Sequence, residues 1–206
     1  MAELEFWDKR YETPGYLFGT EPAQFLKEQA GQMPDASRTL CVADGEGRNS
    51  VYLASLGHQV TAFDQSELGV AKARALAADK GVNPVFQVTD IETWDWSRQY
   101  DVVVAIFIQF APPDLRDRIL EWLGQAVTPG GMLLLHGYVP RQIEYGTGGP
   151  PNAANMYTVE LLREKYSGLN IQRLEEYDRD VDEGRGHSGR SALIDLVATK
   201  PAISGG

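Results

Sequence analysis

The sequence predicts a doubly wound α/β fold, with a seven-stranded, mostly parallel sheet that ends in an antiparallel edge hairpin. Three observations support this fold class. Apolar runs of strand length alternate with helical patterns along most of the chain. The run 101–108 is almost entirely apolar, as expected for a parallel strand buried on both faces. Near the C-terminus, two strand-like runs flank the polar segment 178–190, which is typical of an antiparallel pair at a sheet edge.

The strands are expected where short apolar runs lie between turn residues. In chain order they are 38–43, 59–63, 85–88, 101–108, 132–139, 169–177 and 191–199. The helices are expected where apolar residues recur at helical spacing. They are 3–12, 22–31, 49–56, the helix that Ser66 caps and Gly81 ends, 114–127 and 158–166. This order gives five rounds of strand and helix before the closing hairpin.

The chain has the length and composition of one globular domain. Of its 206 residues, 43% are hydrophobic and 23% are charged. We expect a single domain over 1–206, with 1–35 as an N-terminal helical cap or lid and 36–200 as the core. The segment 141–154 is rich in Gly, Pro and Asn and predicts a long loop of functional importance.

Charge and apolar runs restrict the partners and the location. The formal net charge of −10 disfavours a nucleic-acid substrate, because an acidic surface repels phosphates. No apolar run approaches the roughly 20 residues that a membrane span needs, and the N-terminus lacks the apolar core of a signal peptide. We therefore expect a cytoplasmic protein without a membrane partner. The lone cysteine, Cys41, lies in the first strand and is expected to be a buried thiol.

A glycine turn between the first strand and the following helix is the most informative motif. Gly45 and Gly47 carry no Cβ, so the backbone can approach a ligand closely. Asp64 ends the second strand, about 20 residues later, where a carboxylate can accept hydrogen bonds from ribose hydroxyls. A tight strand–helix turn followed by a surface aspartate remains the structural alternative.

The same turn indicates which nucleoside is bound. A dinucleotide fingerprint has a third glycine, which is absent here, and its helix N-terminus faces a pyrophosphate. Asp44 and Glu46 lie in the turn and would repel a pyrophosphate, but they suit a ligand with an ammonium and a sulfonium group. S-adenosylmethionine is such a ligand. Asp44, Asp64, Asp90 and Gln109 all follow strands, and ligands bind beyond the carboxyl ends of strands in such sheets.

These motifs resemble the class I S-adenosylmethionine-dependent methyltransferases. The resemblance is to the tellurite-resistance-protein-B-like branch, which is related to thiopurine methyltransferases. It is carried by FWDKRY (6–11), YLFGTEP (16–22), ADGEGRN (43–49), VTAFDQS (60–66), TPGG (128–131), GGP (148–150) and EGRGH (183–187). One departure concerns the turn: where most members have an acid and a glycine, this chain has Cys41 and Ala43. Which carboxylate meets the ammonium group of the cofactor is therefore open.

The resemblance implies a set of cofactor-binding residues. They are Asp44, Gly45, Gly47, Asp64, Gln65, Asp90, Ile91 and Phe107. The turn 44–47 would hold the methionine part and Asp64 the ribose. Gln65 would flank the adenine, which Asp90 and its neighbour would contact. The backbone near Phe107 would complete the methionine site.

Catalytic residues are expected in two places. His187 and Arg190, with Arg185 nearby, are basic groups in an acidic protein and suggest recognition of an anionic substrate. A solvated hairpin tip is the alternative. Tyr16 lies in an aromatic N-terminal segment that either closes over the site as a lid or packs on the core. No His or Cys pair has metal-ligand spacing, so no metal is expected.

The sequence thus favours methyl transfer from S-adenosylmethionine to a small molecule, such as a thiol, a thiopurine or an oxyanion of selenium or tellurium. Two alternatives remain open. One is an NAD(P)-binding oxidoreductase, because the early topology is shared. The other is a non-catalytic sensor that binds S-adenosylmethionine. The identity of the acceptor and the oligomeric state cannot be derived from these motifs.

Overall fold

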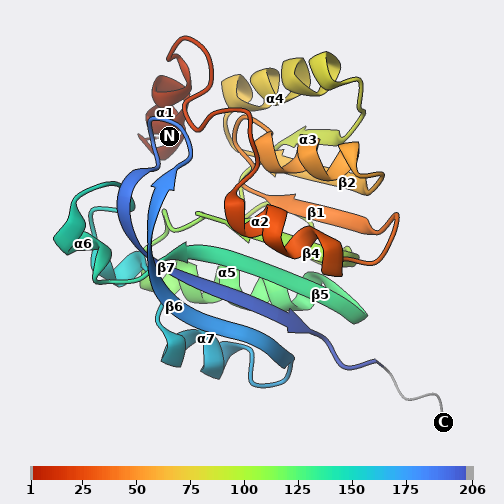
Figure 1. Cartoon of the computed structure of the whole chain (residues 1–206). Coiled ribbons are helices and arrows are strands. Elements are labelled where there is room, and N and C mark those ends of the chain that lie inside the picture. The colour runs from red at the N-terminus through yellow and green to blue at the C-terminus, as the bar shows by residue number, and fades with distance from the viewer. Residues whose placement is uncertain (1, 203–206) are drawn as a thin grey trace. The chain divides into compact units, whose positions relative to one another are not determined.

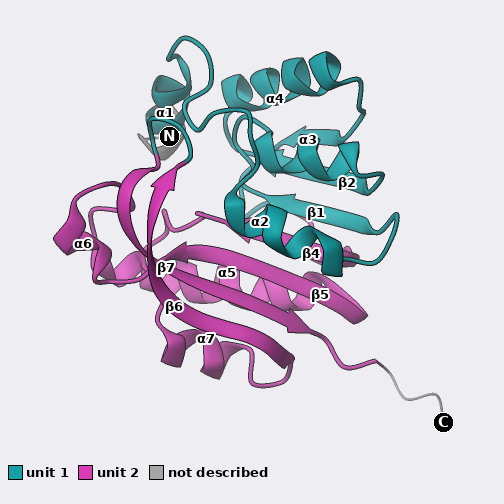
Figure 2. Cartoon of the chain, in the orientation of Figure 1, with its two compact units in different colours: residues 1–94, 183–186 teal, residues 95–182, 187–206 magenta. Residues whose placement is uncertain are grey.

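The computed structural model describes residues 2–202, and their side chains from Phe6 onwards. The chain forms two compact units, which are described separately (Figure 2). The first unit comprises residues 1–94 and 183–186, and the second comprises 95–182 and 187–206. Seven strands form a mostly parallel sheet with an antiparallel edge, which confirms the predicted fold class (Figure 1).

The first unit contains three parallel strands in the order β3-β2-β1. These strands are β1 (Arg38–Val42), β2 (Gln59–Asp64) and β3 (Val85–Val88). Its helices are α1 (Ala2–Tyr11), α2 (Gln24–Gln29), the 3₁₀ turn η1 (Ala30–Gln32), α3 (Arg48–Ser55) and α4 (Glu67–Lys80). The tip of the C-terminal hairpin, residues 183–186, also belongs to this unit.

The second unit contains the order β4-β5-β7-β6. Its strands are β4 (Tyr100–Ile106), β5 (Val127–Tyr138), β6 (Asn170–Asp182) and β7 (Ser188–Thr199). β4 and β5 are parallel, whereas β7 pairs antiparallel with both β5 and β6. Its helices are α5 (Pro113–Ala126), α6 (Gln142–Tyr145), the 3₁₀ turn η2 (Ala153–Asn155) and α7 (Val159–Lys165).

Local chemistry explains where the best-predicted helix begins and ends. The Ser66 hydroxyl accepts a hydrogen bond from the Gly69 N–H at 2.9 Å and so caps α4. Gly81 ends the helix in the left-handed conformation, at φ 68°. Both signals were expected from the sequence, and the helix lies between them.

Large apolar side chains fill the core of each unit. In the first unit Phe63 stacks on Trp94, with ring centroids 4.3 Å apart, and Cys41 is a buried free thiol as expected. In the second unit β4 and β5 are almost wholly buried, as the apolar run 101–108 predicted. This packing fixes the strand ends from which the candidate site residues emerge.

Three expectations about the elements are wrong. Residues 89–99, between β3 and β4, form turns, so the third of the five strand–helix rounds has no helix. The segment 141–154, expected as a loop, contains α6 and η2. Most of the polar segment 178–190 is strand, because β6 runs to Asp182 and β7 begins at Ser188. A half-exposed edge hairpin carries polar residues on one face, which hides its strand pattern.

Candidate functional site

The glycine turn after β1 has the backbone geometry that the motif requires. Gly45 has φ 59° and Gly47 has φ 88°, both in the left-handed region that favours glycine. A Cβ at Gly45 would lie 2.5 Å from the Tyr11 hydroxyl, and one at Gly47 would lie 2.6 Å from the Cβ of Ala73. Both glycines are therefore needed for the turn to pass beneath Tyr11 and beside α4.

Asp64 ties this turn to the end of β2. Its Oδ2 accepts a hydrogen bond from the Gly45 N–H at 2.9 Å, and its Oδ1 accepts one from the Ser66 N–H at 2.9 Å. The residue is only 6% exposed. Burial raises the pKa of Asp64 to about 6, although these two hydrogen bonds act in the opposite direction.

Asp44 is a second buried carboxylate in the turn. It accepts a hydrogen bond from the Ser50 hydroxyl, and its backbone N–H donates to the Phe63 carbonyl at 3.0 Å. Burial raises the pKa of Asp44 to about 7, and the nearby Asp64 adds to the rise. Two desolvated carboxylates at neighbouring strand ends favour a cationic ligand, because a cation would stabilise their ionised forms.

The residues expected at the adenine also belong to the first unit. The Thr89 N–H donates to the Asp64 carbonyl at 3.0 Å, which links the turn after β3 to the end of β2. Asp90 is exposed in that turn and accepts from the Glu92 N–H at 2.8 Å, whereas Ile91 is buried. Gln65 follows Asp64 and is half-buried.

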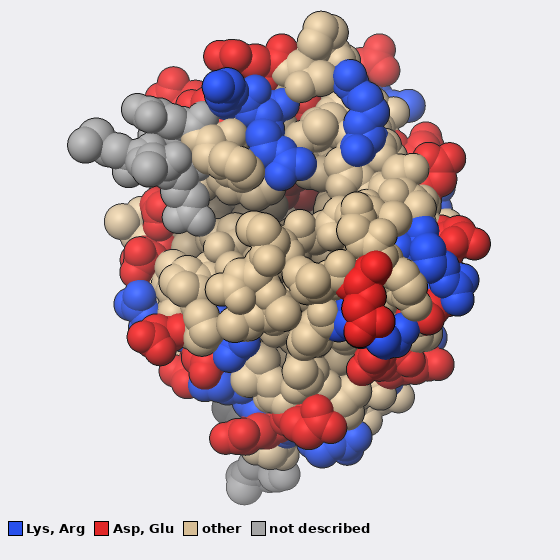
Figure 3. All heavy atoms as spheres, turned by 90° about the vertical axis from the view of Figure 1, so that its left-hand side faces the viewer, with Lys and Arg blue, Asp and Glu red and all other residues tan. Residues whose placement is uncertain are grey.

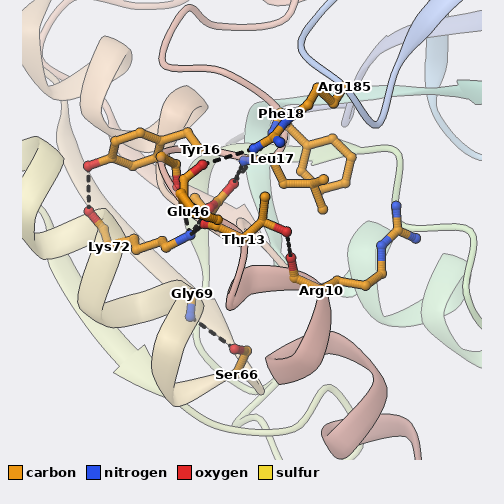
Figure 4. Close-up of polar contacts among 12 residues, drawn as sticks. Arg10, Thr13, Tyr16, Leu17, Phe18, Glu46, Ser66, Gly69, Lys72 and Arg185 are labelled. Atoms are coloured by element: carbon orange, nitrogen blue, oxygen red, sulfur yellow. Dashed lines mark hydrogen bonds and ion pairs between the residues drawn. The ribbon is translucent and has the colours of Figure 1, made fainter.

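Glu46 has a structural role that the sequence did not reveal (Figure 4). Its Oε1 pairs with the Lys72 ammonium at 2.9 Å, and its Oε2 accepts from the Leu17 N–H at 2.7 Å. Lys72 also donates to the carbonyls of Thr13 and Gly15, at 2.9 and 2.7 Å. Both oxygens of Glu46 thus anchor the N-terminal segment, so its expected interaction with the ligand's cationic groups gains no support.

Tyr16 and Tyr11 lie in different environments within the N-terminal segment. The Tyr16 hydroxyl donates to the Lys72 carbonyl at 3.3 Å, and its ring packs on the α3–α4 cluster around Val51. This position favours the packing alternative for Tyr16. Tyr11 is the aromatic residue that lies on the glycine turn, in contact with Gly45. Burial and the carboxylate of Asp64 raise the pKa of Tyr11 well above its usual value, so its hydroxyl stays protonated.

The hairpin tip holds the N-terminal segment from its other side (Figure 1). The Gly186 N–H donates to the Leu17 carbonyl at 3.3 Å, and the Arg185 guanidinium donates to the Pro14 carbonyl at 2.9 Å. Glu183 forms an ion pair of 2.8 Å with Arg48 at the start of α3. The tip therefore belongs structurally to the first unit.

In the second unit, His187 lies in an aromatic cluster. Its ring stacks on Phe107 with centroids 4.1 Å apart, and its Nδ1 lies 2.7 Å from the Tyr138 hydroxyl oxygen. His187 is 8% exposed. Phe107, directly after β4, adopts a left-handed backbone at φ 57°, which is unusual for a bulky residue and marks a constrained site.

Arg190 is in a different environment from His187. Its side chain is 50% exposed, and its guanidinium lies 3.7 Å from Asp178 and 3.9 Å from Asp180 on β6. Because these carboxylates already lie near the guanidinium at the surface, the assignment of Arg190 as a residue that binds an anionic substrate is weakened. His136 is a buried histidine of β5, and its Nδ1 lies 2.7 Å from the buried carboxylate of Asp195.

Gln109 also has a protein partner instead of facing a ligand. Its side-chain amide donates a hydrogen bond to the Tyr138 carbonyl and accepts one from the Tyr138 N–H. The expectation that Gln109 converges with the three aspartates on a ligand is therefore not supported. The signal that could have revealed this role is Gly137, whose missing side chain makes room for the amide.

Three broader observations concern the described part of the chain. Its residues include no cluster of His, Cys, Asp or Glu suited to a metal ion. None of its helices has the length and apolarity needed to span a membrane. On the face drawn in Figure 3, acidic and basic side chains are interspersed, and neither sign covers the face alone.

Comparison with known proteins finds a similarity over part of the chain. Residues 39–131, which include the glycine turn, Asp64 and Asp90, match the family described as "Methyltransferase domain". Over this segment, which is just under half of the chain, the protein is similar to methyltransferase domains. This type of domain uses S-adenosylmethionine, as the resemblance implied, and the two raised carboxylate pKa values fit that cationic cofactor.

The curated relatives of the chain differ in their named activities. Carboxy-S-adenosyl-L-methionine synthase of Shewanella amazonensis is 35% identical over 94 residues, which cover 44% of this chain and 35% of that protein. The tRNA 5-carboxymethoxyuridine methyltransferase of Escherichia coli K12 is 27% identical over 132 residues, which cover 57% and 50%. The chain spans between 35% and 57% of the length of the curated relatives it matches.

Solved structures share the fold over almost the whole chain. A structure concerned with the conversion of a disulfide bond into a thioacetal group during echinomycin biosynthesis has a TM-score of 0.76 and 20% identity, and covers 98% of this chain and 94% of that one. TehB from Haemophilus influenzae has a TM-score of 0.70 and 20% identity, and covers 96% and 67%. At these identities the similarity establishes the fold.

Proposed function

We propose that the protein transfers the methyl group of S-adenosylmethionine to a small molecule with a soft nucleophilic atom, such as a thiol or an oxyanion of selenium or tellurium. The observation that carries the proposal is the pair of desolvated carboxylates, Asp44 and Asp64, beside a turn held open by Gly45 and Gly47. The methyltransferase family match over residues 39–131 supports the choice of cofactor.

In this proposal each part of the cofactor has protein partners. Asp64 binds the ribose hydroxyls, and Asp44 and the glycine turn bind the methionine part. Gln65, Asp90 and Ile91, which belong to the same unit as the glycine turn, bind the adenine. When bound, the cofactor supplies an electrophilic methyl group. The protein aligns the acceptor with that methyl and excludes water.

The acceptor class follows from the resemblance of the motifs and from the charge of the chain. A net charge of −10 is unfavourable for binding a nucleic acid. A thiolate or a chalcogen oxyanion is already a good nucleophile and needs little help from a base. His187, with Arg190 and Tyr16 as further candidates, would bind the acceptor or accept its proton. The buried position of His187 in an aromatic cluster makes it the strongest of the three.

A screen of methyl acceptors tests this function. The purified protein is incubated with labelled S-adenosylmethionine and a thiol, a thiopurine, selenite or tellurite, and S-adenosylhomocysteine is measured. We expect release of S-adenosylhomocysteine with at least one of these acceptors. Binding of S-adenosylmethionine without any transfer would favour the non-catalytic sensor, and tight binding of NAD in its place would favour the oxidoreductase.

A further inference from the structure

The guanidinium of Arg10, in the last turn of α1, lies among three aromatic rings of the first unit. Its central carbon is 5.5 Å from the centroid of the Phe6 ring, 5.1 Å from that of Trp7 and 5.8 Å from that of Phe18. Phe6 and Trp7 precede Arg10 on the same helix at the spacing of side chains that share a face. We call Arg10 and these three rings the arginine cluster.

The cation of this cluster has no carboxylate partner. The Thr13 hydroxyl donates to the backbone carbonyl of Arg10 at 2.9 Å, but the guanidinium forms no ion pair or hydrogen bond within the part of the chain that the structure describes (Figure 4). Arg48 of the same unit, by contrast, pairs with Glu183 at 2.8 Å. Aromatic faces attract a cation without accepting its strong in-plane hydrogen bonds, so the N–H donors of half-buried Arg10 remain for water or a ligand.

The arginine cluster is built on segments that are held in place. Asp8 of α1 accepts a hydrogen bond from the Ser66 hydroxyl at the start of α4. Phe18 packs under the tip of the hairpin, where a Cβ at Gly186 would overlap its ring. The helix that carries Arg10 and the ring that lies beside it are therefore both anchored within the first unit.

The arginine cluster also contacts the candidate cofactor site of the same unit. The Phe18 ring meets the Tyr11 ring edge-on with centroids 6.4 Å apart, and the Tyr11 hydroxyl lies on the glycine turn at Gly45. Burial raises the pKa of Tyr11, and the positive charge of Arg10 opposes that rise. Two side chains, Tyr11 and Phe18, thus connect the guanidinium to the turn.

We propose that Arg10 is a specificity-determining residue of the acceptor site: its guanidinium binds an oxyanion group, such as a carboxylate, on the methyl acceptor. The inference rests on the function proposed above and adds that the acceptor is anionic. In a chain with a formal net charge of −10, a small anion needs a local cation. A planar guanidinium binds a carboxylate through two parallel hydrogen bonds, and stacking on rings keeps this fork in one orientation.

The first test uses the wild-type protein and needs no methyl transfer. The NMR signal of the Arg10 Nε–H group, assigned by its loss in Arg10→Gln, is followed during titration with mercaptoacetate and with mercaptoethanol. These thiols are of similar size and differ in their end group, a carboxylate or a hydroxyl. We expect a saturable shift with mercaptoacetate alone. No shift with either thiol, or an equal shift with both, would overturn the proposal.

This titration separates the anion site from the proposed function. A saturable shift with mercaptoacetate would support anion binding at Arg10 even if no acceptor of the screen were methylated. That second result would overturn the proposed function alone. Methyl transfer without any shift would leave the proposed function in place and overturn the role of Arg10.

The second test compares Arg10→Gln and Arg10→Lys with the matched control Lys9→Gln. Lys9 is the exposed neighbour of Arg10 on α1, so its replacement removes the same charge from the same helix. The preference for mercaptoacetate over mercaptoethanol, measured as the ratio of kcat/KM values, should fall about 10- to 100-fold in Arg10→Gln. Arg10→Lys should keep part of the preference, because it keeps the charge but loses the fork. Lys9→Gln should keep the wild-type ratio.

Two outcomes of this comparison would overturn the proposal. An equal fall in Lys9→Gln and Arg10→Gln would assign the effect to the net charge of the chain. An unchanged ratio in Arg10→Gln would show that the guanidinium does not meet the acceptor and that its contacts with the rings serve packing alone.

Discussion

The carboxylate of Glu46 and the ammonium of Lys72 lie 2.9 Å apart beneath the N-terminal segment, with side chains that are 2% and 20% exposed. The pair joins the glycine turn to α4, and through Leu17, Thr13 and Gly15 it holds the N-terminal segment on both. The turn that shapes the candidate cofactor site therefore also anchors the segment expected to cover it. Loss of the pair should affect stability and acceptor binding together.

Replacing Glu46 with Gln should lower the free energy of unfolding by about 1–3 kcal/mol. The amide keeps an acceptor for the Leu17 N–H, but it leaves the Lys72 ammonium without a counter-charge in a largely buried place. Urea denaturation measures the change. Glu21→Gln is the control, because the Glu21–Lys27 pair is exposed, with side chains at 77% and 39%, and should contribute little. Equal stability of the two variants would argue against an anchoring role for Glu46.

Gly45→Ala should destabilise the fold through both conformation and contact. Its φ of 59° is unfavourable for alanine, and the new Cβ would lie 2.5 Å from the Tyr11 hydroxyl oxygen. We expect a loss of ~2–4 kcal/mol in thermal or urea unfolding. Adding Tyr11→Phe removes the nearest atom, and the next is 3.3 Å away, so the double variant should recover part of the loss. If the double variant recovered no stability, the contact with Tyr11 would not be a cause of the loss.

Affinity for S-adenosylmethionine should rise with pH from about 6 to 8. In the free protein the pKa of Asp44 is about 7 and that of Asp64 about 6, so both are partly protonated near pH 6. A cationic ligand favours the ionised forms, and binding should release protons in this range. Calorimetry in buffers of different ionisation enthalpy measures that release. A pH-independent affinity would show that these carboxylates do not face the ligand's charge.

Asp44→Asn should stabilise the protein without cofactor at high pH. The pKa of Asp44 in the folded protein lies above its unfolded value of 3.8, so the folded protein binds this proton more tightly. Protonated Asp44 therefore contributes to stability at low pH, and this contribution is lost as pH rises from about 4 to 7. Asparagine has no such proton to lose, so the gain should be about 1–4 kcal/mol at pH 8 and fade toward pH 4. Unfolding curves at the two pH values test it; a variant less stable than wild type at pH 8 would refute this account of Asp44.

Sequence patterns predicted the structure correctly where the conformation of a segment is determined by residues close to it in the sequence. The Ser66 cap depends on a neighbour three residues away, and the left-handed backbone of the turn glycines is a local property of the turn. The buried strands were recognisable because both of their faces are covered, so their side chains are uniformly apolar. The fold class follows from these features, and the cofactor-binding residues stay a prediction that rests on the same features.

The assignments that changed depend on partners far along the chain. Glu46 meets Leu17 and Lys72, Arg48 meets Glu183, and the Gln109 amide meets Tyr138, each separated by 26 to 135 residues. No local pattern distinguishes a carboxylate that binds a ligand from one that binds a distant backbone N–H. The strands of the polar edge hairpin are longer than the sequence predicted, because polar residues on the exposed face interrupt the apolar pattern.

The central claim is that Asp44 and Asp64, beside the glycine turn, bind a cationic adenosyl donor. Calorimetric titration of the wild-type protein and of Asp64→Ala with S-adenosylmethionine and with NAD tests it most directly. We expect the wild type to bind S-adenosylmethionine and not NAD, and the variant to bind it ~1.5–3 kcal/mol more weakly, because a charged hydrogen-bond acceptor is lost. Unchanged affinity in Asp64→Ala, or a preference of the wild type for NAD, would contradict the claim.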